Sequence, residues 1–430
     1  MTVEEKYQTI SVIIDDGTGV LFQPMTREYT YILTVKHNLQ YEDDRQNWND
    51  KNKDAIVIKN NFGTKINIEI INIYHHQSLD ISIVKIKYLD ITYLVNLSTN
   101  TLTDGIDFNL YGYPGTRRRE ELKSRLIKLK YNNQPNEDLI VMKNSEHSSQ
   151  GEIRGYSGGG VFYEEDEELY LIGIQRKMDD ESRQEESNNS LNIIPINKFF
   201  EIVETNSNEL QGLYPPFVES FINFIDDAFL LNNMLSSKRI VQGILKNCIL
   251  NKIKVCPSDF LERNEINVLK SNIKDSANNK ILWIMYLEFL VFCNLIKEFD
   301  EFNMSSVDEI KNEFKFIFGK SKEWTSLIPL AMRSDLSSLT SGGTVFIACD
   351  GDCEPFRTHL VKDSLLNISQ RPSHRDEWRI DEGIKNPYDE LVFKHIFDFQ
   401  KKIIENEGSF INLTEFDVND IEGKIKDAVS

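Results

Sequence analysis

Short apolar segments separated by polar turns fill the first half of the chain, from Thr9 to about Ile196. These segments are rich in β-branched and aromatic residues, and turn residues such as Asp15-Asp16-Gly17 separate them. Strands at this spacing are typical of a sandwich or a pair of barrels rather than of βαβ units. We therefore predict an all-β domain over residues 1–205, with strands at Ile10–Ile14, Gly19–Phe22, Tyr29–Val35, Ile56–Ile58, Ile66–Ile73, Ile81–Ile86, Leu122–Leu129 and Leu139–Met142.

The pattern changes after a polar stretch and the break Tyr214-Pro215-Pro216. From Phe217 onward apolar residues recur at three- and four-residue spacing, which indicates helices. We predict a linker at 206–215 and a mainly helical (α+β) domain over 216–430, so that the protein is multidomain. The predicted helices are Phe217–Leu230, Arg239–Lys254, Pro257–Lys274, Asn279–Phe299, Val307–Phe318 and Asp389–Glu405, with one buried strand at Gly343–Cys349.

One apolar run, Ile281–Ile296, raises the question of a membrane. It is interrupted by Glu288 and flanked by Lys280 and Lys297. A membrane-spanning helix needs about 20 apolar residues, and a shorter run is more often a buried core helix. We therefore expect a buried helix and no membrane partner, with a membrane-tethered protein as the alternative.

A serine between glycines, Gly155-Tyr156-Ser157-Gly158-Gly159-Gly160, stands where a turn enters a strand. A serine hydroxyl becomes a nucleophile when a base removes its proton, and acyl transfer also needs donors for the oxyanion. His37 closes an apolar strand and is a candidate base, while Asp80 opens another strand and could orient the imidazole. The structural alternatives are that Ser157 is an incidental serine in a turn, that His37 is an ordinary residue at a strand end, and that Asp80 is a strand cap. His75 and His76 could compete for the base role or for a metal, but loop positions explain them more simply.

The order His37, Asp80, Ser157 is that of the chymotrypsin-type triad. Around it, the first two hundred residues resemble the trypsin-like serine proteases of the chymotrypsin fold, closest to the small bacterial or intracellular members that lack disulfides. The resemblance rests on Leu33-Thr34-Val35-Lys36-His37, on the run from Asp80 to Val84, and on the serine motif. Further segments that match in order are Gly17–Leu21, Leu110–Gly115, Leu171–Ile174 and Ile194–Ile196.

This resemblance implies a double β-barrel and assigns roles to residues. His37, Asp80 and Ser157 would be catalytic, and the backbone N–H groups of Gly155 and Ser157 would form the oxyanion hole. Tyr156 stands where activated trypsins have an aspartate that pairs with a new N-terminus, so we expect control by some other route. The substrate pocket would be lined from just before the serine and from the following strand, by Glu152, Arg154, Gly173, Ile174, Gln175 and Arg176.

Composition narrows the partners and the compartment. The formal net charge of −19 argues against nucleic acid as a partner, because phosphate contacts need clustered Lys and Arg. All five cysteines lie in the second half, and the N-terminus has no apolar signal region. A disulfide-free protease domain predicts a reducing, cytoplasmic setting. Cys349 and Cys353 form a lone C-x3-C, which is weak evidence for a metal, so we expect no metal and no cofactor.

The function that follows from the resemblance is a serine endopeptidase that cleaves protein substrates through an acyl-enzyme. A protease of this kind in the cytoplasm endangers its own cell, so we expect the C-terminal domain to bind a regulatory or sensor protein. That architecture resembles effectors of bacterial stress and anti-phage defence systems. The alternative is a catalytically idle trypsin-like fold that serves as a protein-interaction module.

Overall fold

The computed structural model describes the chain except residues 44–46, 100–104, 118, 122, 146–152, 166, 179–189, 264, 270–272, 274–275, 352, 361–390, 415 and 430. The chain divides into two compact units, Met1–Pro216 and Phe217–Ser430. Each unit has its own sheets and its own buried core.

The first unit begins with a capped helix, α1 (Val3–Ile10), and a six-stranded sheet in the order β6-β1-β2-β3-β8-β7. Neighbouring strands in this sheet run antiparallel. A short hairpin of β4 and β5 projects from it. The strands are β1 (Ser11–Ile14), β2 (Gly17–Phe22), β3 (Tyr29–Thr34), β4 (Gln40–Glu42), β5 (Trp48–Asp50), β6 (Ile58–Lys59), β7 (Ile70–His75) and β8 (Ser82–Lys87).

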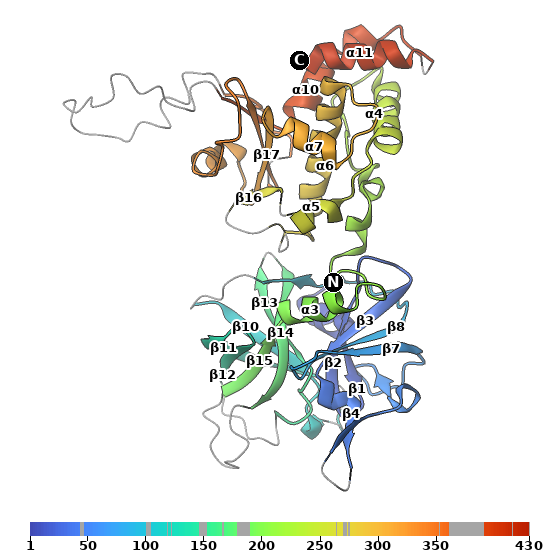
Figure 1. Cartoon of the computed structure of the whole chain (residues 1–430), viewed down its shortest axis with the longest axis vertical. Helices are drawn as coiled ribbons and strands as arrows, with labels where there is room; N and C mark the ends of the chain where they lie inside the picture. Colours follow the sequence, from blue (N-terminus) through green and yellow to red (C-terminus); the bar gives the residue numbers. More distant parts are fainter. Residues whose placement is uncertain are drawn as a thin grey trace, which may run out of the picture. The chain divides into compact units, whose positions relative to one another are not determined.

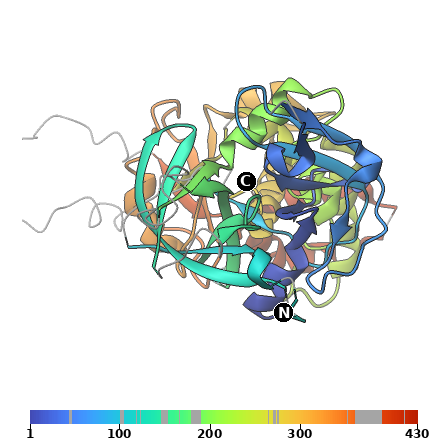
Figure 2. The same cartoon turned by 90° about the horizontal axis from the view of Figure 1, so that it is seen from below.

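A second group of strands closes on itself. Its order is β13-β10-β11-β12-β15-β14, and the additional pairing of β13 with β14 completes a six-stranded ring. Strand β9 (Asn96–Leu97) adds to β14 in parallel. Figures 1 and 2 show the two groups as distinct bodies, the first drawn in blue and the second in teal to green. The ring consists of β10 (Asp107–Gly112), β11 (Arg125–Asn136), β12 (Leu139–Asn144), β13 (Gly160–Glu165), β14 (Glu168–Met178) and β15 (Ser190–Pro195).

Strands β1, β2 and β3 are buried on both faces, which explains why they are nearly continuous apolar runs in the sequence. In β2, Val20 and Phe22 belong to one apolar cluster and Leu21 to another. The side chains of a strand alternate between its two faces, so successive apolar residues can serve two cores. One of these clusters also takes in Phe162 and Leu171 of the second group, so it joins the two strand groups. The predicted all-β, two-barrel fold class of this half is confirmed.

Helix α3 (Asn197–Thr205) and the residues after it complete the first unit. The stretch 206–215, which we proposed as a linker, packs against the first sheet. Leu210 and Leu213 are buried in the shared cluster, and the backbone N–H of Gln211 donates to the Tyr31 hydroxyl at 2.9 Å. These contacts hold the end of the first unit on β3.

The second unit is built around a four-stranded parallel sheet in the order β16-β17-β18-β19. Its strands are β16 (Asn267–Leu269), β17 (Phe314–Gly319), β18 (Thr344–Cys349) and β19 (Val392–His395). Parallel strands are joined by crossovers, which places helices between them in the sequence. These are α6 (Lys280–Lys297), α7 (Met304–Ile310) and the short α8 (Ile328–Ala331). Helices α4 (Lys238–Lys252) and α5 (Pro257–Arg263) precede the sheet, and α10 (Asp398–Glu405) and α11 (Val418–Val429) follow it.

Helix α6 is the buried helix that the sequence predicts. Thirteen of its residues are buried, from Leu282 to Leu295, and its aromatic side chains pack on β17 and β18, as Phe289 does on Phe316 and Phe346. Within the described part of the chain, no helix is both long and apolar enough to cross a membrane. The apolar side chains of α6 therefore pack in the core of the second unit.

Several predicted helices of this unit are shorter than expected. The helix at Val307–Phe318 is wrong after Ile310, because Phe314–Gly319 is β17. In the same way, Asn267–Leu269 is strand β16, and Val392–His395 is strand β19 rather than the start of a helix. β17 is largely apolar and mostly buried, and periodicity alone does not separate such a run from a buried helix. β16 and β19 have three and four residues, which is too short to show a period. The helix at Phe217–Leu230 is also wrong, since this stretch forms 3₁₀ turns at Pro216–Glu219 and Phe221–Phe224.

Candidate functional site

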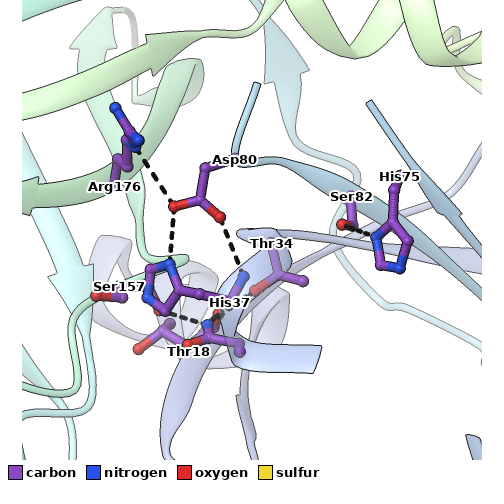
Figure 3. A network of polar contacts seen from close by, with 9 residues as sticks. Thr18, Thr34, His37, His75, Asp80, Ser82, Ser157 and Arg176 are labelled. Atoms are coloured by element: carbon purple, nitrogen blue, oxygen red, sulfur yellow. Dashed lines mark hydrogen bonds and ion pairs between the residues drawn. The ribbon is translucent and has the colours of Figure 1, made fainter. Parts of the chain in front are cut away.

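His37 and Asp80 meet at the edge of the first sheet, where β3 ends and β8 begins. The apolar run of β3 ends at Thr34, and a 3₁₀ turn over Lys36–Leu39 carries His37. Nδ1 of His37 lies 2.8 Å from one carboxylate oxygen of Asp80, and the backbone N–H of His37 donates to the other at 3.0 Å. With Nδ1 facing a carboxylate, the neutral imidazole presents its basic nitrogen, Nε2, on the opposite side. Figure 3 shows Ser157 on that side of the ring.

Asp80 is surrounded by hydrogen-bond donors. Besides His37, Nε of Arg176 on β14 lies 3.4 Å from the same oxygen that faces Nδ1 (Figure 3). Burial by itself raises the pKa of Asp80, but the hydrogen bonds and charge of His37, with a smaller contribution from Arg176, lower it below its usual value. The carboxylate is therefore ionised near neutral pH and able to stabilise a charged imidazolium.

The turn that carries Ser157 is fastened to the first sheet by side chains that the sequence analysis did not single out. The Ser157 carbonyl accepts from the backbone N–H of Thr18 and from the side-chain amide of Asn38, each at 2.8 Å. The Thr18 hydroxyl donates to the Gly155 carbonyl at 2.8 Å. Thr18 lies on β2 and Asn38 directly follows His37, so the serine turn is tied to the segment that holds the histidine. In sequence these are ordinary polar residues, and no local signal marks them.

The backbone N–H groups of the serine turn divide into two sets. Those of Tyr156, Gly158 and Gly159 donate to the carbonyls of Ile153, Gln175 and Tyr156. In the described part of the chain, those of Gly155 and Ser157 have no intramolecular acceptor. Because the peptide unit is planar and trans, a carbonyl held on one side directs the next N–H to the other. The Arg154 carbonyl accepts from the N–H of Gly115, and the Tyr156 carbonyl accepts from the N–H of Gly159. The N–H groups of Gly155 and Ser157 therefore point away from Gly115 and Gly159.

Two glycines make this turn possible. Gly155 and Gly158 have φ of +100° and +88°, a region that L side chains rarely adopt. A Cβ on Gly155 would lie 2.5 Å from the Tyr113 carbonyl oxygen, and one on Gly158 would lie 1.9 Å from that of Thr18. The two glycines are therefore required by backbone conformation and by close contact, of Gly155 with the backbone after β10 and of Gly158 with β2.

Tyr156, between the glycine and the serine, is fully buried in the apolar cluster of the second strand group. Phe108, Leu110 and Val161 belong to the same cluster. At this position the chain has a packed aromatic ring and no carboxylate.

Of the six residues predicted to line the substrate pocket, four lie next to the serine turn. Gly173, Ile174, Gln175 and Arg176 lie on β14, next to the serine turn. Ile174 points into the cluster shared by the two strand groups, and Arg176 is paired with Asp80. Arg154 is exposed, whereas Glu152 lies outside the described residues.

The two other histidines have structural contacts of their own. Nδ1 of His75 lies 2.6 Å from the Ser82 hydroxyl, and Nε2 of His76 lies 2.9 Å from a carboxylate oxygen of Glu201. The other ring nitrogen of His76 accepts from the backbone of Ser78 and Leu79. Among the described residues, no three His, Cys, Asp or Glu side chains are grouped as metal ligands.

Residues 193–405 match a family model described as CTD4, the C-terminal domain 4 of the ABC-three component (ABC-3C) systems. The matched segment begins in β15 and extends to the end of α10. No curated protein matches the chain in sequence.

Solved structures resemble the chain over about half of its length. One is the Rv3671c protease of M. tuberculosis in its active form, with 10% identity and a TM-score of 0.33, covering 47% of this chain and 82% of that one. Another is kallikrein-related peptidase 10 in complex with Zn²⁺, with 11% identity and a TM-score of 0.35, covering 48% of this chain and 98% of that one. At these values the likeness does not establish a shared activity. The chain is thus similar to trypsin-like proteases in its N-terminal half and to the ABC-3C C-terminal domain in the remainder.

Proposed function

We propose that the first unit is a serine endopeptidase and that the second unit binds a regulatory or sensor protein in a bacterial stress or anti-phage defence system. The observation that carries the proposal is the arrangement around Ser157. An oriented His37–Asp80 pair lies on one side of it, and among the described residues the N–H groups of Gly155 and Ser157 have no acceptor. These are the parts that acyl transfer requires.

In the proposed mechanism, Oγ of Ser157 attacks the peptide carbonyl while Nε2 of His37 takes its proton. The oxygen of the tetrahedral intermediate accepts from the N–H groups of Gly155 and Ser157. His37 then gives the proton to the leaving amine, and water hydrolyses the acyl-enzyme by the same steps in reverse. Asp80 keeps the imidazole in the tautomer with Nδ1–H and stabilises its charged form. No hydrogen bond joins Oγ of Ser157 to Nε2 of His37 in this structure, where His37 bonds to Asp80 and Ser157 bonds through its carbonyl. The mechanism requires this hydrogen bond to form when substrate binds, and catalytic hydrogen bonds often tighten only at that stage.

The role of the second unit follows from its family match and from Tyr156. Because a buried aromatic ring precedes the serine, the site has no carboxylate there to pair with a newly cut N-terminus. Control must come from elsewhere. The match to a C-terminal domain of a three-component system supports a second unit that contacts another component.

The first test is labelling of the full-length chain with a fluorophosphonate, which reacts with activated serines. We expect labelling of the wild type and none of Ser157→Ala, while the matched control Ser207→Ala, at an exposed serine of the same unit, labels like the wild type. The labelling should be repeated with the other components of the system co-expressed. A wild type that fails to label in every combination would leave the idle interaction module as the better interpretation.

The substrate is then found by mass spectrometry of cellular proteins cut in the presence of the wild type and not of Ser157→Ala. Cuts concentrated in one protein, and dependent on a co-expressed component, support a regulated processing enzyme. Identical cut maps for wild type and variant contradict peptide-bond cleavage.

A further inference from the structure

The second unit contains a cavity of about 350 Å³. It is lined by residues of α6 and α7, by the start of β17 and by the two residues before Asn267, where β16 begins. Ligand pockets in proteins have volumes of about 300–1,000 Å³. This cavity is at the lower end of that range, so it suits one large side chain better than a nucleotide or another large cofactor.

Much of the wall of this cavity is aromatic. Tyr286 and Phe289 of α6 and Phe316 of β17 line it, and each is at most 5% exposed. The ring centroid of Phe316 lies 5.1 Å from that of Tyr286 and 5.5 Å from that of Phe289. Val307 and Ile310 of α7 add aliphatic groups. Such a wall favours a flat apolar occupant, because aromatic rings pair in offset-stacked or edge-to-face arrangements.

Glu265 brings a carboxylate to the same cavity. Its side chain is 14% exposed, and Oε1 accepts from Nζ of Lys311 at 3.0 Å. Oε2 is buried without a hydrogen-bond partner in the part of the chain that the structure describes. Burial raises the pKa of the Tyr286 hydroxyl, and the negative charge of Glu265 raises it further, so these two groups are neighbours. An unsatisfied carboxylate oxygen is costly, and an occupant that donates a hydrogen bond removes this cost.

The two lysines that line the cavity already have partners. Lys311 also bonds to Oδ1 of Asp308 at 2.6 Å, so its ammonium group contacts two carboxylates. Nζ of Lys315 donates to the backbone carbonyl of Asp335. An anionic occupant would compete with these partners, and a cationic one would lie beside the charge of Lys311. A neutral donor avoids both problems, and its hydrogen bond to a carboxylate is charge-assisted and therefore strong.

We propose that this cavity binds the indole ring of a tryptophan from another component of the system, with the indole N–H donating to Glu265. The proposal rests on the proposed partner-binding role of the second unit and names its site. Tryptophan combines a flat apolar ring with one N–H donor and no charge. It is also among the residues that most often anchor a protein interface by filling a pocket. The Glu265 carboxylate turns toward the ring about its terminal torsion, which has a broad energy minimum, and keeps its bond to Lys311.

The first test uses the full-length protein and two small probes, 3-methylindole and 3-methylbenzofuran, which differ only in an N–H group replaced by oxygen. Ligand-observed NMR titrations measure both affinities. We expect 3-methylindole to bind about tenfold more tightly, because a hydrogen bond to a charged acceptor is lost in the other probe. In Glu265→Gln the ratio should fall to about threefold or less, since the acceptor is then neutral. The matched control is Glu309→Gln, at an exposed glutamate of α7, which should keep the wild-type ratio.

Three results of this titration would overturn the proposal. Equal affinities of the two probes for the wild type would show that no N–H group is recognised. A preference for 3-methylindole that persists in Glu265→Gln would mean that the probe binds elsewhere. Tighter binding of 4-methylphenol than of 3-methylindole would assign the cavity to a tyrosine instead.

The second test uses the full chain co-expressed with the other components. We expect the affinity for one component to fall by about tenfold in Glu265→Gln and on replacement of one tryptophan of that component by phenylalanine, while Glu309→Gln binds like the wild type. Association that is unaffected by Glu265→Gln and by every such tryptophan replacement would overturn the assignment of this cavity and leave the partner-binding role intact. If no component associates with the wild type, the partner-binding role itself fails.

Discussion

Each of the two units contains a buried or half-buried carboxylate, and the pKa values of these two carboxylates are shifted in opposite directions. Asp80 in the first unit faces the His37 ring, the His37 backbone and Arg176, and its pKa is lowered. Glu288 in the second unit is 4% exposed within α6. One of its oxygens accepts from the backbone N–H of Phe229 and from Nε2 of Gln400, each at 2.8 Å, and burial raises its pKa to about 7.

The difference lies in the partners. Asp80 has a titratable ring and a cation beside it and keeps a side-chain exposure of 21%, so its charge is stabilised and available to an adjacent reaction. Glu288 accepts from two neutral donors, the Phe229 backbone and the Gln400 side chain. The first of these bonds anchors a strained loop in which Phe229 and Leu231 adopt left-handed φ of 52° and 45°. Gln400 in turn accepts from the N–H of Leu231. Asp80 thus orients the candidate base His37, whereas Glu288 binds the backbone of a loop to helix α6.

The largest effect should come from Asp80→Asn. An amide can still contact His37, but it does not favour the Nδ1–H tautomer or stabilise the imidazolium, so we expect kcat to fall by about 10⁴-fold. Peptidase assays of the full-length variant with its components would measure this. The control is an unchanged Tm, since both residues fit the same space. A loss below about tenfold would mean that Asp80 does not orient the base.

The second prediction concerns pH and Glu288→Gln. The folded-state pKa of about 7 lies above the ordinary value of 4.5, so the folded unit binds more protons than the unfolded one between these values. The wild-type free energy of unfolding should therefore decrease by roughly 3 kcal/mol as pH rises from about 4.5 to about 7. Above about pH 7 it should stay level. The glutamine keeps an acceptor for Phe229 and Gln400, and its variant should lack this dependence.

Urea unfolding at pH 5 and pH 8, followed by the fluorescence of the buried Trp283 and Trp324, measures this difference within the second unit. Glu309→Gln, at an exposed glutamate, is the control and should behave like the wild type. Equal pH dependence in wild type and Glu288→Gln would show that Glu288 is charged in the folded state and would remove the contrast with Asp80.

The smallest effect should come from Arg176→Gln. Arg176 is 39% exposed, and exposed ion pairs contribute on the order of 1 kcal/mol or less, so kcat/KM near neutral pH should change by less than about fivefold. Removing the cation raises the pKa of Asp80, so activity should be lost at a slightly higher pH on acidification. A pH profile of kcat/KM tests this. A shift of the acid limb to lower pH would contradict the contact.

Local sequence features predicted much of the first unit and little of the second unit's topology. The apolar and β-branched runs of β2 and β3, the glycine frame of Ser157 and the polar strand ends at His37 and Asp80 are all local. In the second unit the sequence predicts helix over β17 and β19. β17 is a largely buried apolar run without polar alternation, and β19 has only four residues, which is too short to establish a period. The sequence names Gln175 as a substrate contact, but only the structure shows that its amide is buried with no hydrogen-bond partner among the described residues.

By itself, the sequence determined the residue types that acyl transfer needs, their order along the chain, the glycines that a left-handed turn requires, and the buried character of α6. These follow from spacing and from the intrinsic properties of each residue. Only the tertiary structure decided that Asn38 and Thr18 hold the serine turn, that Arg176 faces Asp80, and that Glu288 fastens the Phe229 loop. Such contacts join segments far apart in sequence, and their strength depends on burial and on the directions of individual peptide groups, which exist only once the chain has folded.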